Sequence, residues 1–290
     1  MTEPGHRTLI VVPTYNERAN IESFLRSVRG TARDASILVV DDNSPDGTGD
    51  LVDNLARSDS QISVMHRAGK LGLGTAYLEG FAWGMARGFD RFIEMDADFS
   101  HDPKYLKDFE AALDEGADVA VGSRNIPGGS VEGWGLGRHV ISKGGSLYSR
   151  MVLGVSIHDL TTGYKAFTRR ALETLDLSRV QSNGYCFQIE MTYRAIQRGL
   201  KVVEVPIVFV DRREGQSKMS KKNLRRGARS RVEIAPPGAP RRALGRDSPR
   251  TVIRRGASSN GLAGTPWAAS STDVGSSRKL ERARRHSVGC

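Results

Sequence analysis

Short apolar segments that alternate with helical patterns most constrain the fold of this chain. Two apolar runs are typical of buried strands and lie at residues 9–12 and 37–40. Each run ends in a polar turn, and a helical pattern follows the turn. The same order returns between residues 62 and 122, where a strand pattern at residues 91–96 leads into a further polar turn. This alternation predicts an α/β fold whose mostly parallel central sheet is flanked by helices on both faces.

Two aspartates, Asp96 and Asp98, stand at the end of the strand pattern at residues 91–96. Ligands of open parallel sheets bind outside the carboxyl ends of the strands, so the turns after the first, second and this strand should converge. Carboxylate oxygens suit Mg²⁺ or Mn²⁺, which one or two carboxylates and a substrate diphosphate commonly hold together. The pair therefore predicts a metal-assisted site for a nucleotide-linked substrate, although a solvated cap is the alternative interpretation.

A glycine-rich loop occupies residues 69–74. Its glycines fit neither the G-x-G-x-x-G pattern of dinucleotide-binding proteins nor the G-x-x-x-x-G-K-[ST] pattern of ATP-binding loops. These two classes are therefore excluded, and close packing of the loop against a nucleotide or against the sheet is the remaining interpretation.

The length of 290 residues allows one large α/β domain or two small ones. The cysteines, Cys186 and Cys290, form neither a disulfide framework nor a metal-binding pattern, which favours a reducing compartment. We find no leader-like segment before the first strand and no apolar run near the ~18 residues of a membrane-spanning helix. We therefore expect a soluble or peripheral protein.

The formal net charge of +10 is unevenly distributed. Residues 1–220 carry 26 basic against 29 acidic side chains, a net charge of −3, whereas residues 221–290 carry 17 against 4, a net charge of +13. The second segment is rich in Arg, Ser, Gly, Ala and Pro, so we predict one enzyme domain over residues 1–220 and a disordered basic tail. The tail could also bind acidic lipids or nucleic acid, or reflect a shifted reading frame.

Four ordered motifs resemble the family 2 glycosyltransferases, and more narrowly the polyprenol-phosphate (dolichol-phosphate) mannose synthases. They are VPTYNE at residues 12–17, VDDNSPDGT at 40–48, MDAD at 95–98 and SKMS at 217–220. The resemblance spans residues 7–220 and implies a GT-A (Rossmann-like) fold. It also implies inverting transfer of mannose from GDP-mannose to a polyprenyl phosphate, with Mg²⁺ or Mn²⁺ as cofactor. The basic tail has no counterpart in the family.

The resemblance assigns residues to the donor and the metal. The donor site would comprise Pro13, Tyr15, Glu17, Val40, Asp42, Asp96, Ala97, Asp98, Arg212 and Lys218. Asp96, Asp98 and Ser100 would hold the metal, directly or through water, although some relatives carry Gln in place of Ser100. Arg212 and Lys218 would bind the departing diphosphate, whose charge grows in the transition state. The alternative for Arg212 is an exposed basic residue.

The acceptor phosphate would contact Arg124, Arg138 and Ser142, again by resemblance. A phosphate monoester with a second pKa near ~6 is already a nucleophile at neutral pH, so it needs positioning more than a general base. We therefore count Asp96, Asp98, Arg124 and Glu190 as candidate catalytic residues, with Glu190 orienting the sugar or the metal shell. An exposed helix carboxylate is an equal alternative for Glu190.

Apolar residues between positions 138 and 154 recur at helical spacing and could rest in the bilayer surface or pack on the sheet. We expect a peripheral enzyme at the cytoplasmic face of the membrane, with a membrane-anchoring protein as a candidate partner and no nucleic-acid partner. Two alternatives remain open. One keeps the fold but uses UDP-glucose or another donor, and the other is a non-catalytic basic protein that binds membrane or nucleic acid through the tail.

Overall fold

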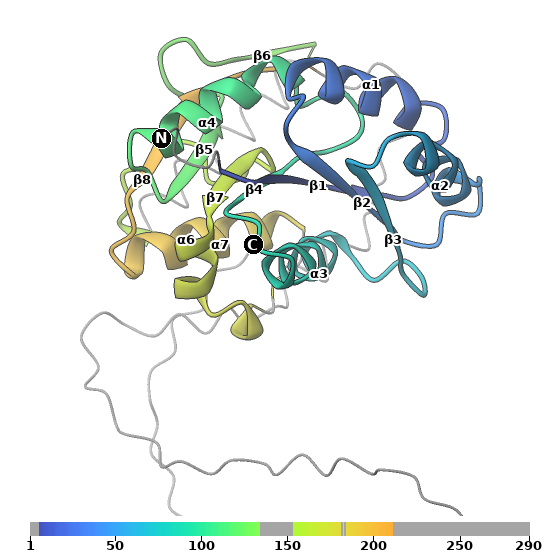
Figure 1. The fold of residues 1–290 in the computed structure, drawn as a ribbon. Coiled ribbons are helices and arrows are strands. Elements are labelled where there is room, and N and C mark those ends of the chain that lie inside the picture. Colours follow the sequence, from blue (N-terminus) through green and yellow to red (C-terminus); the bar gives the residue numbers. More distant parts are fainter. Residues whose placement is uncertain (1–5, 134–152, 181, 183, 211–290) are drawn as a thin grey trace, which may run out of the picture. The chain divides into compact units, whose positions relative to one another are not determined.

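A seven-stranded sheet forms the centre of this computed structural model, which describes residues 6–133, 153–180, 182 and 184–210 (Figure 1). In spatial order the strands are β3 (Ile62–His66), β2 (Ser36–Asp41), β1 (Thr8–Thr14), β4 (Arg91–Glu94), β7 (Lys165–Thr168), β5 (Val119–Ser123) and β8 (Val202–Pro206). β7 runs antiparallel to β4 and β5, and the other neighbours are parallel. The predicted mostly parallel sheet is therefore confirmed.

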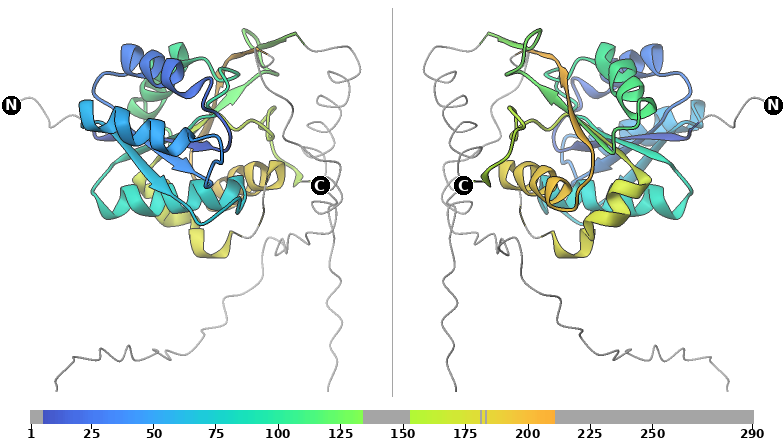
Figure 2. Two further views of the ribbon diagram at one scale, coloured as in Figure 1. Left: turned by 90° about the vertical axis from the view of Figure 1, so that its right-hand side faces the viewer. Right: turned by 90° about the vertical axis from the view of Figure 1, so that its left-hand side faces the viewer.

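Helices cover both faces of the sheet, as the side views in Figure 2 show. α1 (Ile21–Thr31), α2 (Thr48–Ser58) and α4 (Leu106–Asp114) pack on one face, and α3 (Leu73–Ala86), α6 (Arg169–Leu175) and α7 (Tyr185–Gln197) on the other. The residues of β1 explain this arrangement, because Leu9 and Val11 join one apolar core while Ile10 and Val12 join the other. Alternate side chains of a strand point to opposite faces, so β1 needs apolar residues at every position.

Several shorter elements complete the described chain. They are the 3₁₀ turns η1 (Pro103–Tyr105) and η2 (Leu177–Arg179) and the short parallel strands β6 (Ser130–Glu132) and β9 (Val208–Val210). None of the helices in the described ranges is long and apolar enough to cross a bilayer. The predicted tail at residues 221–290 and most of the amphipathic segment at 138–154 lie outside the described residues.

Helix α3 lies unusually close to β1, and glycines make this approach possible. A Cβ atom added at Gly80 would lie only 2.5 Å from Cγ1 of Val11, and one added at Gly84 would lie 2.5 Å from Cδ2 of Leu9. Any larger residue would push the helix off the sheet. The close approach holds the first turns of α3 beside the loops that leave β2 and β4.

The carboxyl ends of the six parallel strands meet at one edge of the sheet, and β7 begins at that same edge. The predicted strand at residues 91–96 ends at Glu94, so Asp96 and Asp98 stand in the following loop. α2 begins at Thr48, because Asp46 Oδ1 accepts hydrogen bonds from the Thr48 amide and hydroxyl.

Candidate active site

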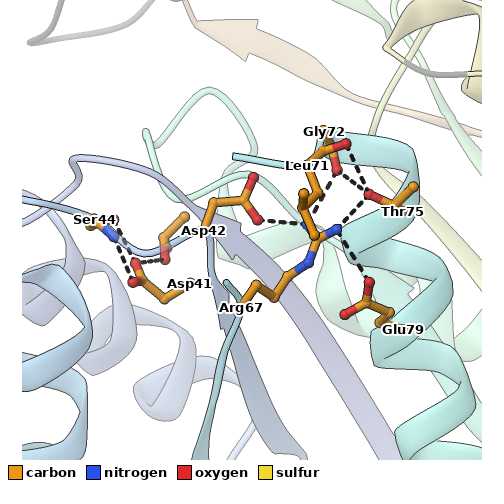
Figure 3. Close-up of polar contacts among 9 residues, drawn as sticks. Asp41, Asp42, Ser44, Arg67, Leu71, Gly72, Thr75 and Glu79 are labelled. Atoms are coloured by element: carbon orange, nitrogen blue, oxygen red, sulfur yellow. Dashed lines mark hydrogen bonds and ion pairs between the residues drawn. The ribbon is translucent and has the colours of Figure 1, made fainter. Parts of the chain in front are cut away.

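The loops that follow β1 and β2 are fastened to each other. The Asp42 amide donates to the Thr14 carbonyl at 3.0 Å. The Asp41 carboxylate accepts hydrogen bonds from the Thr14 hydroxyl at 2.9 Å and the Ser44 hydroxyl at 2.6 Å. Asp41 therefore holds the two loops together, and Figure 3 shows Asp42 directed the other way, toward α3.

A buried arginine meets Asp42 at this edge. Arg67 Nη1 lies 2.5 Å from Asp42 Oδ1, while Nη2 donates to the Thr75 hydroxyl at 2.6 Å and to Glu79 at 3.2 Å (Figure 3). The Arg67 side chain is only 2% exposed. Burial raises the pKa of Asp42, and the Arg67 charge opposes that shift. The sequence prediction missed Arg67, although a basic residue directly after a strand at this edge was a usable signal.

The glycine loop packs against this ion pair. Main-chain amides of Leu71 and Gly72 donate to the Asp42 carboxylate, and the Gly72 carbonyl accepts from Arg67 at 3.3 Å. Gly72 has a φ of 108°, which other residues rarely adopt. The loop thus covers one side of Asp42, while the Leu71 side chain projects outward and is 54% exposed.

The loop after β4 carries the two aspartates in different surroundings. The Asp96 side chain is 32% exposed, whereas Asp98 is buried and accepts hydrogen bonds from the Ser100 amide at 3.1 Å and hydroxyl at 2.5 Å. Between them and Ser100 stands Phe99, whose φ of 60° costs of order 1–3 kcal/mol in a residue of this kind. This left-handed turn brings Ser100 back onto Asp98, so the Asp98 carboxylate and the Ser100 hydroxyl lie together.

Asp96 is held by aromatic and imidazole groups. Its amide donates to Nδ1 of His101 at 3.0 Å, which places the proton of a neutral imidazole on Nε2. The His101 ring is buried and stacks on Tyr164 with centroids 4.9 Å apart. The hydroxyl of buried Tyr77 lies 3.4 Å from Asp96 Oδ1. Burial first, and then the Asp96 charge, raises the pKa of Tyr77 well above its ordinary value, so Tyr77 remains a neutral donor.

A buried polar cluster lies next to this loop. Glu94 of β4 is paired in register with Lys165 of β7, and the Lys165 ammonium donates to the Gln188 carbonyl at 2.6 Å and to Gln188 Oε1 at 2.8 Å. Burial raises the pKa of Glu94 to about 8, against the attraction of Lys165, and burial lowers the pKa of Lys165 to about 8. Gln188 Nε2 faces the Glu94 carboxylate and lowers the pKa of Glu94, which favours the ionised form of that carboxyl. The contact does not reach good hydrogen-bond geometry.

Arg124, predicted to bind the acceptor phosphate, follows β5 at the same edge. Its guanidinium makes a two-pronged contact with buried Asp159, Nε to Oδ2 at 2.6 Å and Nη2 to Oδ1 at 2.8 Å. Nη2 also donates to the Thr161 hydroxyl at 2.9 Å. Glu204 of β8 accepts from the amide of Asp159 and so fixes the same loop. Arg124 is thus charge-compensated within the protein.

Glu190 is buried rather than exposed. Its Oε2 accepts hydrogen bonds from the amide and the hydroxyl of Ser182, and its Oε1 accepts from Arg194 Nε at 2.7 Å. The carboxylate therefore fastens the segment before α7 to the helix. Its neighbour Gln188 stands two positions earlier, which places it on a different side of α7.

The remaining predicted donor residues lie at the ends of β1 and β2. Pro13 and Val40 pair in register, and the Val40 side chain is fully buried, so this residue can offer only main-chain atoms. The Lys70 ammonium lies over the aromatic ring of Tyr15, with Nζ 4.1 Å from the ring centroid. The main-chain amide of Glu17 donates a hydrogen bond to the Thr48 hydroxyl at 3.0 Å. The predicted residues outside the described ranges are Arg138, Ser142, Arg212 and Lys218.

Residues 9–176 match the family described as glycosyl transferase family 2. The chain belongs to this family. This glycosyltransferase is 54% identical over 223 residues to a polyprenol monophosphomannose synthase of Mycolicibacterium smegmatis, an alignment that covers 77% of this chain and 84% of that protein. It is 46% identical over 214 residues to an undecaprenyl-phosphate mannosyltransferase of Micrococcus luteus. This alignment covers 74% of this chain and 88% of that protein. These findings confirm the family resemblance and the prediction of an enzyme.

The glycosyltransferase also resembles solved structures in its fold. A glucosyl-3-phosphoglycerate synthase of Mycobacterium tuberculosis superposes with a TM-score of 0.55 at 22% identity, covering 77% of this chain and 76% of that one. The predicted GT-A fold is therefore confirmed. No group of three or more His, Cys, Asp and Glu side chains suited to a metal ion occurs within the described ranges.

Proposed function

We propose that this glycosyltransferase moves mannose from GDP-mannose to a polyprenyl phosphate, with inversion at the anomeric carbon. One observation carries the proposal. The Asp-x-Asp loop and the Asp42–Arg67 ion pair share one sheet edge, in a chain 54% identical to a polyprenol monophosphomannose synthase. A nucleotide bound after β1 and β2 would extend its diphosphate and sugar toward the loop after β4.

The donor would contact the carboxyl ends of β1 and β2, the loops that follow them, the loop after β4 and the segment outside the described ranges. Nucleoside contacts would come from Pro13, Tyr15, Glu17, Val40 and Asp42, and contacts to the diphosphate and sugar from Asp96, Ala97, Asp98, Arg212 and Lys218. Cations aimed at the departing diphosphate lower the barrier, because its charge grows in the transition state.

The side-chain oxygens of Asp96, Asp98 and Ser100 fit Mg²⁺ or Mn²⁺. Two carboxylates and a hydroxyl stand within five residues, and the Asp96 side chain reaches solvent. An ion that keeps several waters and binds substrate phosphates needs only one or two carboxylates, so a larger ligand cluster is not required. When bound, the ion would supply positive charge to the leaving diphosphate.

The acceptor phosphate would bind beside Arg124, Arg138 and Ser142. One of its oxygens would attack the anomeric carbon while the bond from that carbon to the diphosphate breaks, and GDP leaves with the electron pair. The attacking oxygen carries no proton at neutral pH, so no general base is needed. Glu190 would support the sugar site through the segment at Ser182.

A lipid acceptor requires contact with the membrane, and we propose that the enzyme is a peripheral protein at its cytoplasmic face. The basic tail at residues 221–290, with its net charge of +13, would attract anionic lipids, and a membrane-anchoring protein is a candidate partner. We propose no nucleic-acid partner.

Radiolabelled transfer assays test the donor and the acceptor together. The full chain should move mannose from GDP-mannose to a polyprenyl phosphate in detergent, and transfer from UDP-glucose should be at least ~100-fold slower, because a site that pairs its polar groups with one ligand leaves them unpaired with another. Equal or faster transfer from UDP-glucose would contradict the proposed donor. Absence of any lipid product would contradict the proposed acceptor.

Replacing Arg124 by lysine should weaken acceptor binding and spare the donor. Lysine keeps the charge opposite Asp159 but loses the two-pronged geometry, so we expect a roughly tenfold higher KM for polyprenyl phosphate. Affinity for GDP-mannose, measured by calorimetry, should change less than twofold. Loss of donor affinity with an unchanged acceptor KM would contradict the assignment.

A further inference from the structure

Lys165 determines the orientation of the side-chain amide of Gln188. An ammonium group can only donate, so the contact of Lys165 Nζ with Gln188 Oε1 at 2.8 Å requires oxygen at that position. The amide nitrogen is therefore directed away from Lys165. Gln188 is 2% exposed, and among the described residues Nε2 has no acceptor in good hydrogen-bond geometry, although it faces the Glu94 carboxylate. Buried donors without a well-placed acceptor are rare in native proteins, so a ligand group that accepts from Nε2 would be stabilised there.

Gln188 Nε2 lies close to the position that a side chain would take at Gly163. A Cβ atom added at Gly163 would lie 3.7 Å from Gln188 Nε2, 3.7 Å from Asp96 Oδ2 and 3.4 Å from His101 Cε1. Because Gly163 has no side chain, a ligand atom at this position could contact both Gln188 Nε2 and Asp96 Oδ2. These two groups come from different elements. Gln188 stands in the first turn of α7, and Asp96 in the loop after β4.

A hydroxyl group matches this pair of partners. It can accept a hydrogen bond from an amide N–H and donate its own proton to a carboxylate. The carboxamide carries two N–H groups, so attraction between one of them and Glu94 leaves the second for a ligand. Asp96 belongs to the loop assigned to the donor sugar, and its side chain is partly exposed.

We propose that Gln188 is a specificity-determining residue that donates a hydrogen bond to one hydroxyl of the transferred sugar, while that hydroxyl donates to Asp96. This inference rests on the proposed function. Nε2 is covered by its neighbours, so binding would include a small shift at the Gly163 loop. Lys165 acts through Gln188 as a positioning residue, because it fixes which side of the amide faces the sugar.

Kinetics with monodeoxy analogues of GDP-mannose, each lacking one hydroxyl, test this inference. Gln188→Met should lower kcat/KM for GDP-mannose about tenfold, the value of one typical hydrogen bond. The wild-type enzyme should lose a similar factor with one analogue, and Gln188→Met should show no further loss with that same analogue. A purely structural role for Gln188 would instead lower the rate with all donors by one common factor, and that result would overturn the inference.

Two further variants keep the test decisive. Gln188→Glu keeps an oxygen for Lys165 and replaces only the donor nitrogen, so it carries the test if the methionine variant does not fold. Thr192→Val is the matched control, because Thr192 is buried on the same helix and donates to the Gln188 carbonyl at 3.1 Å, leaving the amide in place. For each analogue, Thr192→Val should show the same loss of kcat/KM, relative to GDP-mannose, as the wild-type enzyme. If the wild-type enzyme transfers nothing from GDP-mannose, the proposed donor fails and this inference fails with it; normal transfer without coupling refutes only the role of Gln188.

Discussion

Replacing Asp98 by asparagine should lower the turnover number about 10²–10³-fold, the loss typical of removing one electrostatic contact to a developing charge. Asparagine keeps an oxygen that can accept the two hydrogen bonds from Ser100, so the loop should retain its conformation. The carboxylate charge that would hold Mg²⁺ or Mn²⁺ against the diphosphate is lost. Turnover at saturating GDP-mannose and metal, together with thermal unfolding, measures the two effects separately.

The matched control for Asp98→Asn is Asp53→Asn. Asp53 is a partly exposed carboxylate on α2 that contacts His66, far in sequence from the Asp-x-Asp loop. Its substitution should leave turnover within twofold of the wild-type value. Full activity of Asp98→Asn in the presence of a chelator would refute the assignment of this loop to a metal and diphosphate.

Replacing Asp159 by alanine should lower the free energy of unfolding by about 3–5 kcal/mol, the loss expected when one partner of a buried ion pair is removed. Asp159 is fully buried, and the change would leave the Arg124 guanidinium without its two-pronged partner. Urea unfolding of the full chain at neutral pH measures the loss. Glu173→Ala, which removes an exposed i,i+4 pair with Arg169, should cost less than about 0.5 kcal/mol.

The contribution of Asp159 should depend on pH in one direction. Burial opposes its ionisation, but hydrogen bonds and charge from Arg124 outweigh burial and lower the pKa of Asp159 below the ordinary 3.8. A lowered pKa in the folded state means that the stabilisation is fully present above that ordinary value and is lost as the pH falls through the folded value. The stability difference between wild type and Asp159→Ala should therefore be constant from pH 5 to 7 and shrink below about pH 4. A difference that grew in acid would contradict the pairing.

Local patterns allowed much of the fold to be predicted. Four consecutive apolar residues in β1 and in β2 indicate strands buried on both faces, and the polar residues that follow mark their carboxyl ends. Element boundaries were less predictable. The strand expected to reach Asp96 ends at Glu94, and the reversed strand β7 was not singled out, because its direction depends on how the chain returns to the sheet edge.

The sequence prediction missed the buried partners of the site. Arg67, Lys165 and Gln188 come from separate segments, and each gains its role from a residue distant in the chain. No spacing rule links Asp42 to Arg67 or Glu94 to Lys165. Such pairs form only when strands take a definite register and a helix packs over them, so the sequence could not predict them.

Local patterns in the sequence predict the order of strands and helices up to residue 122, the polar turns at the sheet edge and the family to which the motifs belong. Short-range periodicity and turn chemistry carry that information, because they depend on neighbouring residues. The burial of each polar side chain and the groups that it faces depend on how distant segments pack together. Gln188 and Glu190 stand two positions apart in one helical pattern, yet packing directs one toward Lys165 and Gly163 and the other toward Ser182 and Arg194. The free energy of each polar group is set by desolvation and by partners that arrive from elsewhere in the chain, and no local pattern contains them.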